Sequence, residues 1–240
     1  GPSQYAKNVK IEWEKKGHKV KVRTFHFEHF LPSGFRHFYY FLKIIPRVYW
    51  CDFILALDTF SVGLPSVLGA KIFGKKIIIR TGGDFLWEQY VERTGKKVLF
   101  RSFYVQEKNS LSKKEKIIFN LTKWTLKNAS KVVFSTEWQR DIFLQAYDLD
   151  ITHTAIVENY YGPKEGDFAP QNNIFVASSR NLVWKNLDVV KTVFSRIKST
   201  SLFLDNLLFD EFQDKIKNSY AIVLFSLGDI SPNLILAAIR

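Results

Sequence analysis

Two cations, Arg180 and Lys185, lie between an apolar block at 174–177 and an amphipathic segment at 187–197. The apolar block predicts a strand, and the segment predicts a helix because its apolar side chains recur at three- and four-residue steps. A loop between a strand and a helix lines the ligand crevice of an open α/β sheet, where two cations suit a phosphate or diphosphate. Ordinary solvated loop charges give the same pattern, so both interpretations stay open at this point.

The composition is that of an ordinary globular protein. With 240 residues and 46% hydrophobic content, the chain is able to bury one large core or two modest ones, which excludes a disordered chain. Its 35 Lys and Arg residues against 23 Asp and Glu residues give a formal charge of +12. This excess favours an anionic partner: nucleic acid, an anionic membrane face or a nucleotide.

Metal and disulfide chemistry find little support. Cys51 is the only cysteine, which excludes an internal disulfide and a thiolate metal cluster and fits a reducing cytosol. His26, His29 and His37 lie in an aromatic run without a further ligand pattern, so we expect no metal site. No apolar run is long enough to span a bilayer.

The elements that position these residues alternate between strand and helix, which predicts parallel, doubly wound α/β sheets. An aromatic-rich stretch at 35–45 is expected to end before Pro46, and the basic region beyond Gly95 is expected to be irregular. Residues 136–139 predict a capping box that begins a helix. Strands are predicted at 19–24, 53–57, 77–79, 132–134, 156–157, 174–177, 202–204 and 221–225, and helices at 3–17, 62–73, 85–93, 117–125, 187–197 and 209–216.

Four stretches in the order of a known family carry a resemblance: GPSQYAKNV with GHKVKV downstream, VVFSTEW followed by IVENYYG, SSRNLVWKN, and SLGDISPNLILAAIR. The chain resembles the family-four (group 1) glycosyltransferases with the GT-B fold. The resemblance implies two Rossmann-like doubly wound domains, the second incomplete. An acceptor-binding domain at 1–160 would be joined by a Gly- and Pro-containing linker at 161–173 to a donor-binding domain at 174–240. The chain looks like a family member trimmed at both ends.

The activity implied by the resemblance is transfer of a sugar from a nucleotide-diphospho-sugar, linked to UDP or GDP, to a glycan or lipid-linked acceptor. The transfer would retain the anomeric configuration and would need no metal or cofactor. Arg180 and Lys185 match the cationic pair that neutralises the donor diphosphate in the family. Preorganised cations of this kind lower the barrier because negative charge grows on the leaving phosphate.

The donor loop departs from the family pattern of two glutamates separated by seven residues. Asp229 takes the first position and Ala237 the second, so the expected ribose contact of the second glutamate is missing. The resemblance also places Ser231 and Asn233 in the donor loop, where a helix start offers amides to an anion. Gly1 corresponds to a glycine-rich loop after an absent first strand. A weakened donor site, a shifted ribose contact and a catalytically silent relative all remain open.

Asp84 ends the turn 81–84, where enzymes of this family place their cleft and often carry a histidine. Its carboxylate is suited to orienting an acceptor hydroxyl or taking its proton. Alternatively, the glycines of this turn supply backbone freedom and Asp84 caps the helix 85–93.

Aromatic and basic residues at 35–47 and 96–116 are typical of a face that lies on anionic lipid, which would suit a lipid-linked acceptor. Alternatively, these aromatics fill a core and the lysines confer solubility. We therefore expect a bacterial cytoplasmic enzyme of polysaccharide or glycolipid biosynthesis, peripheral on the inner membrane face if the lipid interpretation holds. The alternatives are a non-catalytic nucleotide-sugar-binding relative and a basic nucleic-acid-binding α/β protein.

Overall fold

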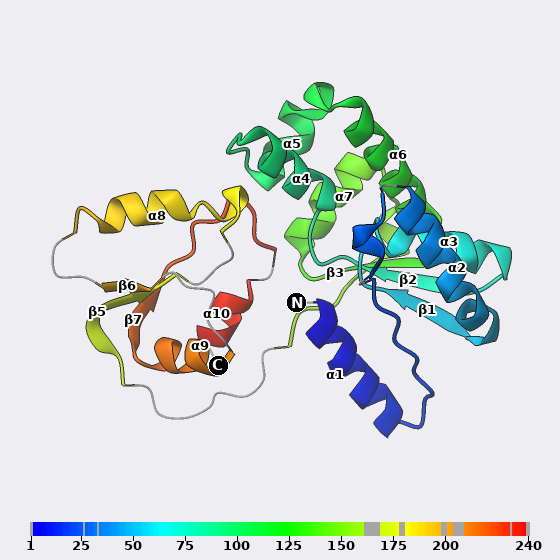
Figure 1. The fold of residues 1–240 in the computed structure, drawn as a ribbon, viewed down its shortest axis with the longest axis horizontal. Coiled ribbons are helices and arrows are strands. Elements are labelled where there is room, and N and C mark those ends of the chain that lie inside the picture. Colours follow the sequence, from blue (N-terminus) through cyan, green and yellow to red (C-terminus); the bar gives the residue numbers. More distant parts are fainter. Residues whose placement is uncertain are drawn as a thin grey trace. The chain divides into compact units, whose positions relative to one another are not determined.

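The structure is a computed structural model that describes residues 2–25, 27–32, 34–160, 169–177, 181–197, 201–203, 209–230 and 232–238 (Figure 1). By its contacts the chain divides into two compact units. The first comprises Gly1–Leu86 and Leu111–Val157, and the second comprises Trp87–Ser110 and Glu158–Arg240. This division differs from the sequence-based boundary at residue 160, because Trp87–Ser110 groups with the C-terminal residues.

The first unit is built on a four-stranded sheet in the order β1-β2-β3-β4, with every neighbouring pair parallel. The strand order follows the chain order without a reversal. The strands are β1 (Phe53–Ala56), β2 (Lys76–Arg80), β3 (Lys131–Phe134) and β4 (Thr154–Ile156). Their connections contain α3 (Gly63–Ile72), α4 (Phe85–Thr94), α5 (Phe100–Gln106), η2 (Lys108–Ser110), α6 (Lys113–Lys127), α7 (Glu137–Tyr147) and η3 (Ile151–His153).

Aromatic rings from the strands and helices form the core of this unit. Phe134 on β3 lies edge-on to Phe143 of α7, with ring centroids 5.3 Å apart. Tyr147 packs against both Phe143 and Phe119, with 5.2 Å between centroids in each pair. These side chains are buried because each adds a large apolar area to the contact between sheet and helices.

The N-terminal part differs from the sequence expectation in two places. The chain forms α1 (Pro2–Lys15), the 3₁₀ helix η1 (Phe27–Phe30) and α2 (Phe35–Trp50). The predicted strand at 19–24 is wrong: this stretch is unpaired, and Val22 is exposed despite the alternating pattern. Alternation alone does not make a strand, because a strand also needs a neighbour for its backbone groups.

The predicted end before Pro46 is also wrong, because α2 continues through that proline to Trp50. A proline inside a helix removes one backbone hydrogen bond and costs about 3 kcal/mol. Burial of Tyr40, Ile44 and Val48 on one face offsets this cost. They pack against Phe25, Ile54, Val62 and Phe73.

The region beyond Gly95 is not irregular, since it contains α5 with Phe100 and Phe103 buried. Neither aromatic belongs to a lipid-facing surface, because each is at most 1% exposed.

The second unit contains a three-stranded parallel sheet in the order β6-β5-β7. The strands are β5 (Gln171–Val176), β6 (Ser201–Phe203) and β7 (Ser219–Ile222). Its C-terminal helices are η4 (Val183–Lys185), α8 (Leu187–Phe194), α9 (Phe209–Lys217) and α10 (Asn233–Ala238), and by its contacts the unit also includes α5, η2 and most of α4. The expected parallel α/β class is therefore confirmed in both units.

The predicted linker 161–173 is only partly described, since 161–168 lie outside the described residues. Its last residues are not linker, because β5 begins at Gln171. Within the described residues, every helix is too short or too polar to cross a membrane.

Candidate functional site

The strand order of the second sheet reverses at its central strand. From β5 the chain passes through α8 to β6 on one side, and then through α9 to β7 on the other side of β5. β5 and β7 are therefore adjacent strands, and the segments that follow their carboxyl ends lead away in different directions. Such a reversal is the usual ligand crevice of an open α/β sheet.

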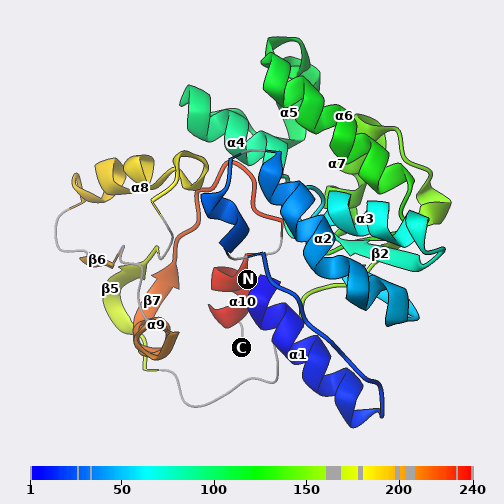
Figure 2. The ribbon, with the colours of Figure 1, turned by 45° about the vertical axis from the view of Figure 1, so that its right-hand side comes forward.

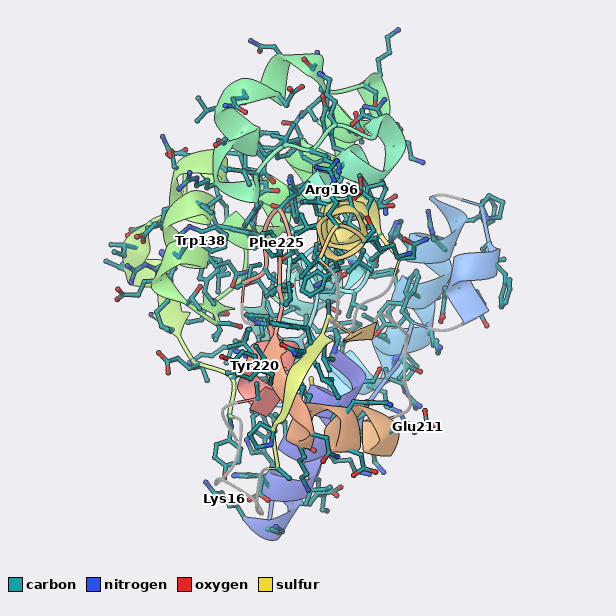
Figure 3. The ribbon with its side chains drawn as sticks, turned by 90° about the vertical axis from the view of Figure 1, so that its left-hand side faces the viewer. Lys16, Trp138, Arg196, Glu211, Tyr220 and Phe225 are labelled. Atoms are coloured by element: carbon teal, nitrogen blue, oxygen red, sulfur yellow. The ribbon has the colours of Figure 1, made fainter. Side chains whose placement is uncertain are left out.

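Hydrogen bonds to two backbone carbonyls join the two segments at this edge. The amide of Leu227 donates to the carbonyl of Trp184 over 2.8 Å. The side-chain amide of Asn186 donates to the carbonyl of Phe225 over 3.3 Å. Figure 3 labels Phe225, beyond the carboxyl end of β7, and Tyr220 on the strand itself. The two segments thus form one connected surface.

An ion pair lies at the centre of this surface. The ammonium of Lys185 is 2.5 Å from Oδ2 of Asp229, and the hydroxyl of Ser226 donates to the same oxygen over 3.2 Å. The ammonium also lies 4.2 Å from the ring centroid of Trp184, a cation–π distance. The side chains of Lys185 and Asp229 are only 15% and 18% exposed, so solvent screens this pair less than a surface pair.

The segment Trp87–Ser110 contacts both the β5 and the β7 side of the site. Trp87 packs against Trp184 with centroids 5.6 Å apart and against Phe100 with centroids 5.1 Å apart. The amide of Phe100 donates to the carbonyl of Leu227 over 3.1 Å. A Cβ added at Gly228 would lie 2.4 Å from Cβ of Phe100, so only glycine fits there without movement.

The same segment also contacts α8, the helix after η4. The ammonium of Lys97 lies 2.6 Å from Oδ2 of Asp188 in the first turn of that helix. The hydrogen bond from Lys97 lowers the pKa of the Asp188 carboxyl below its ordinary value. Lys97 therefore pairs with Asp188, whereas Lys185 pairs with Asp229.

The predicted site residues are distributed unevenly over the described chain. Lys185 and Asp229 lie together, whereas Arg180, Ser231 and Gly1 lie outside the described residues. Asn233 begins α10, a helix of six residues that also contains Ala237. The roles of all these residues in binding a donor stay predictions.

Asp84 belongs to the first unit and lies between β2 and α4. It is 2% exposed, and its Oδ2 accepts a hydrogen bond of 3.2 Å from the hydroxyl of the equally buried Tyr147. A carboxyl group with so little surface is poorly placed to meet an acceptor molecule. This burial argues against direct contact with an acceptor, and both the catalytic and the turn interpretation of 81–84 stay predictions.

Sequence reasoning did not single out Ser226, Trp184, Trp87 or Gly228. Ser226 and Gly228 stand within three residues of Asp229, so a search around each charged loop residue would have found them. Trp87 and Trp184 gave no such indication, because buried aromatics are common in any core.

A metal centre finds no support in the described part of the chain. No group of three or more His, Cys, Asp or Glu side chains there is arranged to hold a metal ion.

Comparisons with solved structures find similar proteins, one of which is described below. No protein-family model matches the chain, and a search of curated proteins finds no match. The chain is similar to a solved structure described as "Crystal structure of Anabaena Alr3699/HepE in complex with UDP". The TM-score is 0.44 and the identity 12%, over 76% of this chain and 51% of that chain. The chain thus spans about half the length of that protein.

Proposed function

We propose that this chain binds a nucleotide-diphospho-sugar at the carboxyl edge of the second sheet and belongs to a retaining, metal-independent glycosyltransferase. The observation that carries the proposal is the ion pair of Lys185 and Asp229 at the reversal of the strand order. The pair lies within two of the stretches through which the sequence resembles family-four glycosyltransferases.

The chemistry assigned to Lys185 is stabilisation of a leaving group. When the bond between the anomeric carbon and the diphosphate breaks, the bonding electron pair stays on the phosphate oxygen. A preorganised ammonium beside that oxygen stabilises the growing charge, more strongly in a crevice than in bulk water. An acceptor hydroxyl, from a glycan or a lipid-linked sugar, then forms the new bond to the anomeric carbon and gives its proton to the leaving phosphate oxygen.

Asp229 and Ser226 are suited to the sugar. A carboxylate accepts hydrogen bonds from sugar hydroxyls, and the Ser226 hydroxyl both donates and accepts. Asp229 also fixes the ammonium of Lys185 over 2.5 Å before a ligand arrives. A bound diphosphate would share that ammonium with Asp229. The Asp229 carboxylate would then position the cation and also contact one face of the donor sugar.

Calorimetric titration of UDP and GDP into the parent protein tests this assignment. We expect one nucleotide to bind, and Lys185→Ala and Arg180→Ala each to weaken it by roughly tenfold or more, as for loss of a charge-assisted hydrogen bond. Lys191→Ala is the matched control, because Lys191 is an exposed cation on α8. Its affinity should equal that of the parent.

Two results would contradict the proposal: a folded protein that binds neither nucleotide, or a Lys185→Ala variant with parental affinity. Equal and strongly salt-dependent binding of both nucleotides and of single-stranded DNA would indicate the nucleic-acid-binding alternative.

A further inference from the structure

Helix α2 has two apolar faces, and within the described residues only one of them is covered. Tyr40, Ile44 and Val48 are buried in the core of the first unit. On the opposite side, large apolar side chains recur at three- and four-residue steps, and each is at least 49% exposed. This α2 outer face consists of Phe35, Phe38, Tyr39, Leu42, Tyr49 and Trp50.

The neighbouring helix α3 extends the exposed apolar surface. The two helices are in direct contact and lie side by side in Figure 2. Val48 of α2 packs closely on Gly69 of α3, whose added Cβ would be 3.5 Å from it. Leu68 and Ile72 of α3 are also exposed. Eight large apolar side chains exposed on two contacting helices are more than the scattered ones of an ordinary protein surface.

The sequence before and within α2 is rich in positive charge. Residues 15–51 contain eight Lys and Arg residues and one acidic residue, a net of +7 with histidines neutral. The acidic residue, Glu28, is buried and pairs with Lys43 over 2.6 Å. Arg47 is exposed on α2.

The basic segment before α2 lies along this helix. The Tyr40 hydroxyl donates to the carbonyl of Arg23 over 3.3 Å, and the Lys43 ammonium donates to that of Thr24 over 3.1 Å. The exposed side chains of Lys19, Lys21 and Arg23 therefore belong to the α2 side of the first unit.

We propose that the α2 outer face docks on the surface of an anionic lipid bilayer, with the helix lying in the plane of the interface. Interfacial helices combine an apolar face with flanking cations, and Tyr and Trp rings favour the headgroup level. The absence of exposed acidic residues from 15–51 fits an anionic bilayer, which attracts each nearby cation. The sequence left membrane contact and core filling open for these aromatics. The buried face of α2 fills the core, and we assign the membrane contact to its exposed face.

Co-sedimentation of the parent protein with lipid vesicles tests this proposal, which does not rest on the donor site. Vesicles contain phosphatidylcholine with roughly 30% phosphatidylglycerol, or phosphatidylcholine alone. We expect binding to the anionic vesicles and at least about tenfold weaker binding to the neutral ones. Salt should weaken the binding to the anionic vesicles.

The decisive variant combines Phe35→Ser, Phe38→Ser and Leu42→Ser, which should reduce binding to anionic vesicles by at least about tenfold. The matched control combines Ile117→Ser, Trp138→Ser and Ile151→Ser, three exposed apolar side chains elsewhere in the first unit. The control should bind as the parent does. Circular dichroism melts should show that both variants fold, because each replaced side chain is at least 41% exposed.

Trp50 gives an independent readout, since it is 81% exposed at the end of α2. Vesicles with brominated acyl chains should quench its fluorescence, and Trp50→Phe should abolish most of that quenching. Parental binding by the triple α2 variant, or no binding of the parent to anionic vesicles, would overturn the proposal. A concentration-dependent dimer that the triple α2 variant abolishes, without vesicle binding by the parent, would also overturn it in favour of a second copy.

Discussion

Gly228 is the position where one added methyl group should disturb the proposed donor site. A Cβ at this position would lie 2.4 Å from Cβ of Phe100 and 3.1 Å from Cη2 of Trp87. Carbon atoms in contact normally stay about 3.5–4.0 Å apart. The methyl group of Gly228→Ala therefore requires a movement of about 1 Å. The nearest atom is next to the backbone of α5 and cannot rotate away.

The cost follows from the packing of the surrounding residues. Phe100 and Trp87 are at most 2% exposed, so neither has free space to enter. Overpacking of such a core typically costs about 1–3 kcal/mol. The movement would also stretch the 3.1 Å hydrogen bond from the Phe100 amide to Leu227. For a unit of roughly 100 residues, this corresponds to a decrease in Tm of about 5–15 °C.

Differential scanning calorimetry of the parent and Gly228→Ala measures this effect, and calorimetric titration with the nucleotide that binds the parent measures its consequence. We expect a lower Tm and weaker nucleotide binding, because the shift displaces Asp229 relative to Lys185. Gly82→Ala is the control: Gly82 has no positive φ, and its added Cβ meets no atom within 4 Å.

An unchanged Tm for Gly228→Ala would refute the packing argument. Equal losses in Gly228→Ala and Gly82→Ala would refute it as well, since they would indicate a general effect of replacing glycine.

Two further predictions concern buried hydroxyl groups of the first unit. Burial and, secondly, the charge of Glu28 raise the pKa of Tyr40 to about 12. The neutral phenol therefore contributes stability that is complete below its unfolded pKa of about 10 and is lost as the pH rises through 12. The difference between the absorbance titrations of the parent and of Tyr40→Phe should show one phenol that ionises near pH 12. Ionisation of that phenol near pH 10 would contradict this prediction. Tyr147→Phe removes a donor from buried Asp84 and should cost about 1–3 kcal/mol in urea unfolding. The exposed Tyr160→Phe should cost almost nothing, and equal effects would show that the buried hydrogen bond is not responsible.

Local patterns in the sequence sufficed for most helices and for the buried strands. The helix at α7 begins where Thr136 predicted it, because the Thr136 hydroxyl accepts from the Gln139 amide over 3.2 Å. The reciprocal half of the box differs: the Gln139 side chain accepts from the Ser135 amide. Such contacts form between residues a few positions apart, so their residue types nearly determine them.

The errors of sequence reasoning arose where distant contacts outweighed local preference. Residues 19–24 have a strand pattern without a partner strand, and α2 continues through Pro46 because its buried face packs on the sheet and α3. Neither outcome is visible in the local pattern, because each depends on what lies beside the segment in space.

The sequence by itself determined the parallel α/β class and placed Lys185 and Asp229 in loops after strands. Only the tertiary structure decided that these residues, 44 positions apart, form an ion pair. The physical reason is strand order: β7 pairs with β5 and not with β6, which brings their carboxyl ends together. Likewise, the aromatic residues of α2 are visible in the sequence, but the packing of Tyr40, Ile44 and Val48 decided which aromatics stay exposed.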